Sequence, residues 1–385
     1  MVRRRAVVAA FGPLLLSGVS SGCTATATAP ETAAGAEELR AAVDRWAAAV
    51  RSGDLAGVEL ASWSYRITRA RQDGDGRATV RAELGYRIAG YDSGPVTTER
   101  ALRLARRDGR WQVTSDRPAQ GAAQQLWDQG ALQVVRGRRS LVLGSGQDPE
   151  RLRAVAATAD RAVPAVSAAW AGPWPGRVVV LVPGSLEGMG ALLGAPADRH
   201  RGIAAVTTGR AGGGPDAPAD RVVVNPEAYT GLSGVGQDMV LTHETAHVAT
   251  RTHTSAATPM WLSEGFADWA AYRGTAHPAG QAAPALRDAV RAGLAPAGLP
   301  SDGDFAFTGD AEALARAYEG GWLACALIAD RWGEPELRAF YRAVGAHRRR
   351  EAREQAVSQA LREVLGTTPE EFTARWRGYV RERLG

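Results

Sequence analysis

The spacing of apolar residues changes along the chain, and this change limits the fold to a combination of sheets and helices. Between residues 62 and 114, apolar and polar residues alternate in several short segments, a pattern typical of strands that bury one face. From Gly234 to the C-terminus, apolar residues recur at helical spacing, interrupted by a loop around residues 295–304. The sequence therefore predicts an α+β fold whose C-terminal part is helical.

Length and composition exclude several classes of protein. The chain has 385 residues, which corresponds to about two or three domains. Hydrophobic residues make up 45% of the chain and charged residues 23%, and glycine and proline are too few for a low-complexity protein. A wholly disordered, a collagenous and a multi-span membrane protein are excluded.

The N-terminus has the pattern of an export signal. Residues 1–23 combine three arginines with an apolar stretch, residues 6–16, that is too short to span a bilayer. The segment before Cys23 resembles the lipobox of bacterial lipoproteins, in which the cysteine receives a lipid. This resemblance implies a lipoprotein anchored through Cys23 on the outer side of the cytoplasmic membrane. Residues 24–36 are rich in Thr, Ala and Pro, a composition that predicts a flexible tether. The alternative is cleavage near residues 25–27 and secretion.

The mature chain carries little net charge and one cysteine. The formal charge is +5, and loss of the three signal arginines leaves +2. This value is too small to support nucleic-acid binding, so we expect no nucleic-acid partner. With Cys23 lipidated, Cys325 is the only remaining cysteine, so we expect no intramolecular disulfide.

Residues 37–118 are predicted to form an N-terminal module with one helix and an antiparallel sheet. The helix covers residues 37–50, and Asp-Gly pairs mark the turns between strands. The predicted strands are 62–69, 77–88, 97–105 and 110–114. A helix followed by such a meander resembles the nuclear-transport-factor-like cone fold, which implies a spacer or a partner-binding module.

Residues 130–385 are predicted to form a second domain with a small mixed sheet followed by helices. Its predicted strands are 132–135, 140–144, 177–182, 202–208 and 221–225, and helices are expected at 149–170 and 185–193. The helical part begins with residues 234–251.

The sequence His243-Glu244-Thr245-Ala246-His247 lies in this last helical stretch. Histidines four residues apart project from one face of a helix and can bind one cation, and the glutamate between them can act on a metal-bound water. A catalytic zinc site takes three protein ligands and leaves a fourth position for water. A third ligand is therefore expected elsewhere in the chain.

Two residues are candidates for the third ligand. Glu264 lies at the start of another predicted helix, and His253 lies at the longer spacing used by metzincins. Metzincins need glycine where this chain has Thr250, because the helix must end there in a turn that a β-branched residue disfavours. This argument favours Glu264.

The segments HETAH and Trp261-Leu262-Ser263-Glu264-Gly265-Phe266-Ala267-Asp268 resemble those of gluzincin metallopeptidases. The resemblance covers roughly residues 130–385 and implies a zincin-like domain. It implies that His243, His247 and Glu264 bind Zn²⁺ and that Glu244 is the catalytic base. It also implies that Asp268 orients one of the histidines.

A second segment, Ala317-Tyr318-Glu319-Gly320-Gly321-Trp322, resembles zinc aminopeptidases, in which the tyrosine donates to the oxyanion. Tyr318 is therefore the candidate oxyanion stabiliser, the alternative being a structural aromatic. The Gly-x-Met-Glu-Asn segment that binds a free substrate amine is absent, so aminopeptidase activity does not follow. Strand 221–225 occupies the place of the gluzincin edge strand that pairs with extended peptide.

The expected function is hydrolysis of a peptide or protein substrate by an exported zinc metallopeptidase. Two alternatives remain at this stage. One is a non-catalytic envelope lipoprotein with a peptidase-like fold that binds a partner or a cell-wall component. The other is a structural zinc site, for which no suitable fourth ligand is evident in the sequence.

Overall fold

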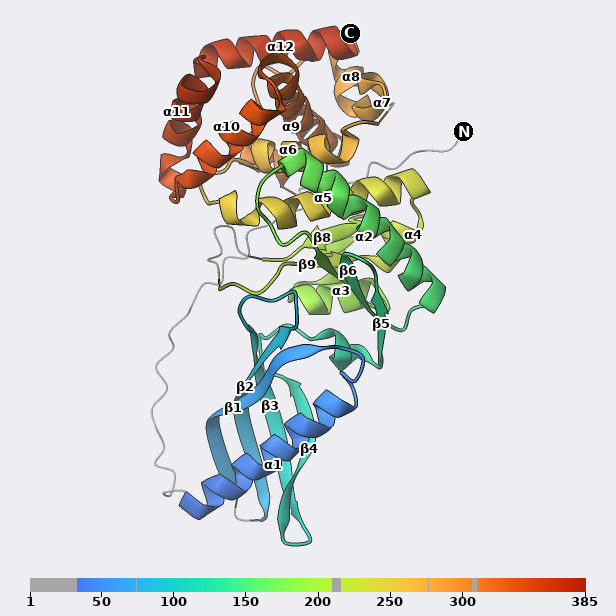
Figure 1. Ribbon diagram of the computed structural model, residues 1–385, viewed down its shortest axis with the longest axis vertical. Helices are drawn as coiled ribbons and strands as arrows, with labels where there is room; N and C mark the ends of the chain where they lie inside the picture. Colours follow the sequence, from blue (N-terminus) through green and yellow to red (C-terminus); the bar gives the residue numbers. More distant parts are fainter. Residues whose placement is uncertain (1–32, 74, 210–215, 276, 307–309) are drawn as a thin grey trace.

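The computed structural model describes residues 33–73, 75–209, 216–275, 277–306 and 310–385. The signal segment 1–23 with Cys23, and the tether as far as residue 32, lie outside the described residues. The α+β prediction is confirmed: an antiparallel sheet is followed by a mixed sheet and then by helices (Figure 1). Among the described helices, none combines the length and the apolar composition needed to cross a lipid bilayer.

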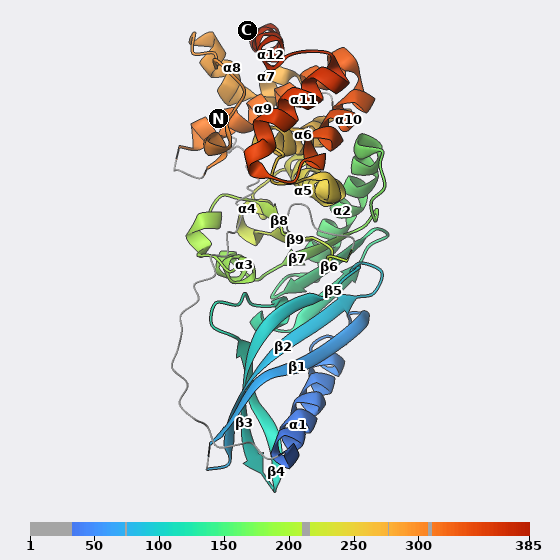
Figure 2. The same cartoon turned by 90° about the vertical axis from the view of Figure 1, so that its left-hand side faces the viewer.

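The N-terminal part consists of α1 (Ala33–Ser52) packed on a four-stranded sheet (Figure 2). Its strands follow one another in the sheet and are all antiparallel. They are β1 (Leu60–Asp73), β2 (Arg77–Ile88), β3 (Val96–Arg107) and β4 (Arg110–Pro118). The Asp-Gly turn between β3 and β4 is formed as expected, because Asp108 and Gly109 both adopt positive φ, 49° and 76°. Helix α1 begins at Ala33, so the tether prediction was wrong for residues 33–36, where the alanines favour helix.

The second sheet has the order β5-β6-β7-β9-β8. Strands β6, β7 and β9 are parallel, and β5 and β8 run antiparallel at the two edges. They are β5 (Leu132–Arg136), β6 (Ser140–Ser145), β7 (Val178–Val182), β8 (Ala205–Thr207) and β9 (Arg221–Val224). The prediction that strand 221–225 lies at the edge was therefore wrong. The consecutive valines of β9 are buried on both faces, as is typical of an internal strand, and β8 takes the edge.

The two faces of this mixed sheet are covered differently. Helices α2 (Pro149–Trp170) and α5 (Gly234–Thr250) pack on one face. On the other face, α3 (Leu186–Leu193) covers β9 and β8. The N-terminal module covers β6 and β7, where three buried side chains belong to the same apolar core as α1 and the antiparallel sheet: Leu141, Leu143 and Val179. The two parts of the chain therefore share one core.

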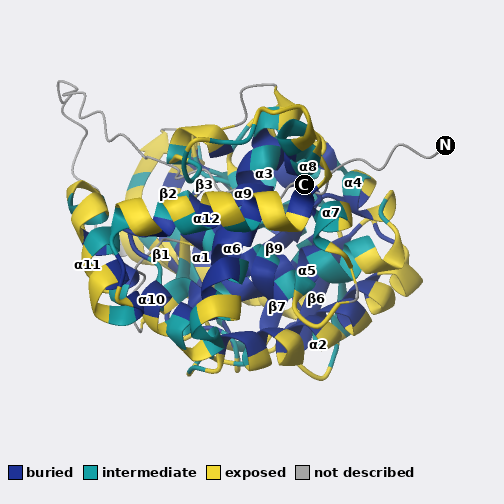
Figure 3. Ribbon diagram, turned by 90° about the horizontal axis from the view of Figure 1, so that it is seen from above, coloured by how far each residue is buried: buried dark blue, intermediate teal, exposed yellow. Residues whose placement is uncertain are grey.

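The C-terminal half is helical, and buried residues concentrate where α5 and α6 meet (Figure 3). The helices are α4 (Pro226–Thr230), α6 (Met260–Tyr272), α7 (Ala279–Ala282), α8 (Pro284–Arg291), α9 (Ala311–Trp332), α10 (Glu334–Ala346), α11 (Arg353–Leu365) and α12 (Pro369–Leu384). Helix α12 begins with a capping box between Thr368 and Glu371, and it buries Phe372 and Trp376.

The shared core predicts that a substitution in the mixed sheet destabilises the protein. Leu141 is 0% exposed, and Leu141→Ala should lower the free energy of unfolding by about 2–5 kcal/mol because it leaves a cavity in the shared core. Leu294 is 74% exposed, so Leu294→Ala should change it by less than about 0.5 kcal/mol. Urea unfolding measures both values. Equal unfolding midpoints for the two variants would contradict the shared core.

Candidate metal centre

Helix α5 brings the two histidines of the HETAH segment to one point. The helix begins at the N-cap Ser233, whose hydroxyl accepts from the Gly236 N–H. It runs unbroken to Thr250, so His243 and His247 lie one turn apart. Both imidazoles are buried, and their Nε2 atoms are 3.1 Å apart. The predicted helical pair is thus formed.

Glu264 reaches these histidines from the neighbouring helix α6. Its Oε2 lies 3.3 Å from Nε2 of His243 and 3.5 Å from Nε2 of His247. The side chain is fully buried, and no donor among the described residues meets hydrogen-bond geometry with either carboxylate oxygen. Among those residues, this group of histidines and glutamate is the one that could hold a metal ion.

Asp268 contacts the far side of His243, as the sequence predicts. It lies one turn after Glu264 on α6, and its Oδ1 is 2.7 Å from Nδ1 of His243. When Nδ1 donates to this carboxylate, Nε2 is the nitrogen left to bind a cation. The contact therefore fixes the orientation of the ring.

The alternative ligand His253 is not part of this group. It lies in the short 3-10 helix Arg251–His253 after α5, and its ring packs on Trp170 at a centroid distance of 5.4 Å. The structure therefore brings Glu264, and not His253, to the histidine pair.

The buried charges of the group shift one another's pKa. Burial raises the pKa of Glu264, but the adjacent His247 and His243 outweigh burial and lower it to about 2. Burial also lowers the pKa of His243, and the carboxylates of Asp268 and Glu264 outweigh it and hold the pKa well above its ordinary value. The group is thus built around a carboxylate that stays ionised.

Glu244 is buried beside the histidines and is held by a residue that the sequence did not single out. Its Oε2 accepts a hydrogen bond from the Thr207 hydroxyl at 2.7 Å, whereas Oε1 is buried without a partner among the described residues. Burial raises the pKa of Glu244. Thr207 ends the edge strand β8, and no local pattern reveals that this strand faces α5.

Tyr318, a residue of α9, lies beside the group formed by the two histidines and Glu264. Its ring centroid is 6.4 Å from that of His243 and 5.1 Å from that of Phe305, and the side chain is buried. Burial, and then the charge of Glu264, raise the pKa of the phenol well above its ordinary value. The phenol is therefore neutral and able to donate a hydrogen bond.

Two glycines allow α6 and α9 to cross closely enough for this arrangement. A Cβ on Gly265 would lie 2.2 Å from the carbonyl oxygen of Gly321, and a Cβ on Gly321 would lie 2.8 Å from that of Trp261. Only residues without a side chain fit at this crossing. Gly265 directly follows Glu264 on α6, and Gly321 lies three residues after Tyr318 on α9. The segment that contains Glu264 and the segment that contains Tyr318 therefore contact each other at these glycines.

Glu319, next to Tyr318, fastens another helix. Its carboxylate accepts hydrogen bonds from the N–H groups of Ala285 and Leu286 in the first turn of α8. Burial raises its pKa to about 7. The glutamate of the Tyr-Glu-Gly-Gly segment thus supports the C-terminal helices.

Comparison with known proteins adds no relative. No protein-family model matches the chain, and the curated proteins include no match.

The contact between Asp268 and His243 predicts a loss of metal affinity on its removal. With Zn²⁺ as the probe for a divalent metal ion, Asp268→Ala should weaken binding about 10- to 100-fold, because His243 loses the partner that orients it and raises its basicity. His253→Ala is the matched control and should leave the affinity unchanged. Titration against a chromophoric zinc chelator measures both affinities. Weaker binding in the His253 variant alone would reverse the assignment of the third ligand.

Proposed function

We propose that this protein is an exported zinc metallopeptidase that hydrolyses peptide bonds. The observation that carries the proposal is the triangle formed by Nε2 of His243, Nε2 of His247 and Oε2 of Glu264, with sides of 3.1, 3.3 and 3.5 Å. Three ligands at about 2.0–2.1 Å from a tetrahedral zinc ion lie about 3.3–3.4 Å apart. The distances between the three donor atoms therefore support a site in which these atoms occupy three of the four vertices of a zinc tetrahedron.

The donor set supports zinc as the ion. Calcium and magnesium prefer oxygen ligands, whereas two imidazoles and one carboxylate suit zinc. Both oxygens of the buried Glu264 carboxylate lack a hydrogen-bond donor among the described residues. The adjacent histidines offset part of the cost of burying this ionised carboxylate, and a bound cation would offset it further.

The residues around the triangle support hydrolysis rather than a purely structural role. When bound at such a site, zinc acts as a Lewis acid and lowers the pKa of water to about 7. Thr207 holds Oε2 of Glu244. Oε1, which has no partner among the described residues, is then the atom that takes the proton from the attacking water and passes it to the leaving amine. The Tyr318 phenol donates to the oxygen on which negative charge develops.

The edge strand β8 supports an extended peptide as substrate. It is the edge strand of the mixed sheet, and its last residue contacts the proposed catalytic base. An edge strand leaves every second pair of backbone N–H and C=O groups available to a peptide that adds as a further strand. We expect peptide or protein substrates and no nucleic-acid partner. A lipid anchor at Cys23 would place the site at the membrane surface.

Glu244→Gln tests the proposed base. The variant should lose at least about 10²- to 10⁴-fold in kcat, because glutamine cannot accept the proton, while it keeps the size of the side chain and an acceptor for Thr207. Zinc content by plasma emission spectroscopy should stay at the wild-type level. Undiminished hydrolysis of a peptide library would remove Glu244 from the mechanism. A wild-type protein that binds zinc and cleaves none of the library would favour the non-catalytic alternative.

Tyr318→Phe tests the proposed oxyanion donor. It should lower kcat about 10²- to 10³-fold with little change in KM, because the phenol acts on charge that develops in the transition state. Tyr379→Phe is a matched control, because that hydroxyl bonds Asp330 on the surface of α9. Steady-state kinetics on one peptide substrate separate the two parameters. A change in KM alone would assign Tyr318 to substrate binding.

A further inference from the structure

A buried ion pair joins the N-terminal module to the mixed sheet. Asp92, in the segment between β2 and β3, contacts Arg221, the first residue of β9. The pair is bidentate, with Nη1 of Arg221 2.8 Å from Oδ1 and Nη2 2.8 Å from Oδ2. Both side chains are buried, so water screens their attraction little.

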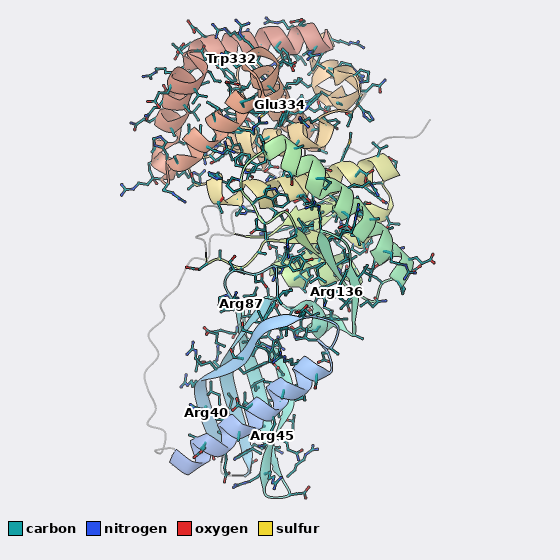
Figure 4. All side chains as sticks on the ribbon, in the orientation of Figure 1. Arg40, Arg45, Arg87, Arg136, Trp332 and Glu334 are labelled. Carbon is teal, nitrogen blue, oxygen red and sulfur yellow. The ribbon has the colours of Figure 1, made fainter. Side chains whose placement is uncertain are left out.

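The Asp92 carboxylate also binds backbone on both sides of the junction. Its Oδ2 accepts from the Ile88 N–H at 2.7 Å, within its own module, and its Oδ1 accepts from the Ala219 N–H at 2.9 Å, just before β9. Arg87, labelled in Figure 4 at the top of the N-terminal module, donates to the Asp92 carbonyl at 3.2 Å. Asp92 is thus fixed in place and holds the start of β9.

The start of β9 in turn determines the position of β8. Arg221 donates its N–H to the Thr208 hydroxyl at 3.0 Å, and its carbonyl accepts from the Thr208 N–H at 2.8 Å. The residue before Thr208 is Thr207, which pairs with Val222 and donates to Glu244. Asp92 is therefore connected to the proposed base through two strands.

A second ion pair ties the same point to the metal-binding helix. Asp220, the residue before Arg221, contacts Arg251, which directly follows α5. The segment before β9 is consequently held by the N-terminal module on one side and by the C-terminal end of α5 on the other. Strand β8 has three residues and lies at an edge, so its position depends on these neighbours.

We propose that the N-terminal module is a positioning element for the proposed active site, and that Asp92 acts through Arg221, β9 and Thr207 to hold the Glu244 carboxylate. Asp92 is a positioning residue and not a catalytic one. The inference rests on the proposed function for its kinetic consequence, whereas its structural consequence can be measured without it. A displacement of about 1 Å at a catalytic group can cost up to about 10²-fold in rate.

Asp92→Asn in the full-length chain tests the structural consequence. Hydrogen–deuterium exchange of the metal-free protein should be about tenfold faster in residues 203–208 and 221–225, while residues 149–170 of α2 exchange as in the wild type. Arg136→Ala is the matched control. Arg136 bonds the Gly57 carbonyl at 3.1 Å across the same junction but from β5, at the opposite edge of the sheet (Figure 4). This control should change neither segment.

Three outcomes of this exchange experiment would overturn the proposal: unchanged exchange in Asp92→Asn, equally faster exchange in α2, or the same acceleration in Arg136→Ala. Asp92→Asn leaves the Arg221 charge without its counterion and can therefore prevent folding. In that event, the double variant Asp92→Leu/Arg221→Leu removes both charges and should give the same localised acceleration.

Kinetic measurements test whether the ion pair between Asp92 and Arg221 acts through Thr207. Asp92→Asn and Thr207→Val should each lower kcat about tenfold, while KM and zinc affinity stay within about twofold of the wild-type values. Thr207→Ser should keep the wild-type kcat, because serine retains the hydroxyl. Combining Asp92→Asn with Thr207→Val should cost no more than the larger single effect, because both act on one contact. Additive losses, or no rescue by serine, would overturn the proposed route. A wild-type protein without hydrolytic activity would instead refute the proposed function. The exchange results would still show whether Asp92 positions β8 and β9.

Discussion

The buried carboxylate of Glu264 lies against two imidazoles, those of His243 and His247, and the surrounding elements hold the three side chains together. Isolated burial of such a charge opposes folding. The two histidines lower the pKa of Glu264 to about 2, so the carboxylate stays ionised beside them. The helices that carry these three residues must therefore be fixed firmly against each other.

The close approach of helices supplies that rigidity. Gly265 and Gly321 let α6 and α9 touch backbone to backbone, which places Glu264 on one helix and Tyr318 on the other beside the same histidine. Asp268 then restrains His243 from behind. In metal sites generally, the outer contacts matter as much as the ligands, because they set the direction of each donor atom.

The N-terminal part of the chain contributes to this arrangement from the opposite side of the sheet. Its apolar core includes side chains of β6 and β7, and the carboxylate of Asp92 binds Arg221 at the start of β9. A module that shares a core and a buried ion pair with its neighbour moves with it, unlike a domain on a flexible linker. This packing gives the N-terminal module a physical connection to the site that the expected role of a spacer or a partner-binding module does not suggest.

Features that depend on the spacing of residues along one helix or turn could be predicted without the fold. Helical geometry places His243 and His247 on one face and Asp268 one turn after Glu264, and the capping box at Thr368 starts α12, so these could be predicted from residue intervals alone. The preference for Glu264 over His253 also followed from a local argument, the inability of Thr250 to form a sharp turn.

Which distant segments meet depends on the packing of the whole fold. The contact of Thr207 with Glu244, the internal place of β9 and the pairing of Asp92 with Arg221 depend on the order of strands in the sheet. No interval along the chain encodes that order, because it follows from how whole elements bury their apolar faces against one another.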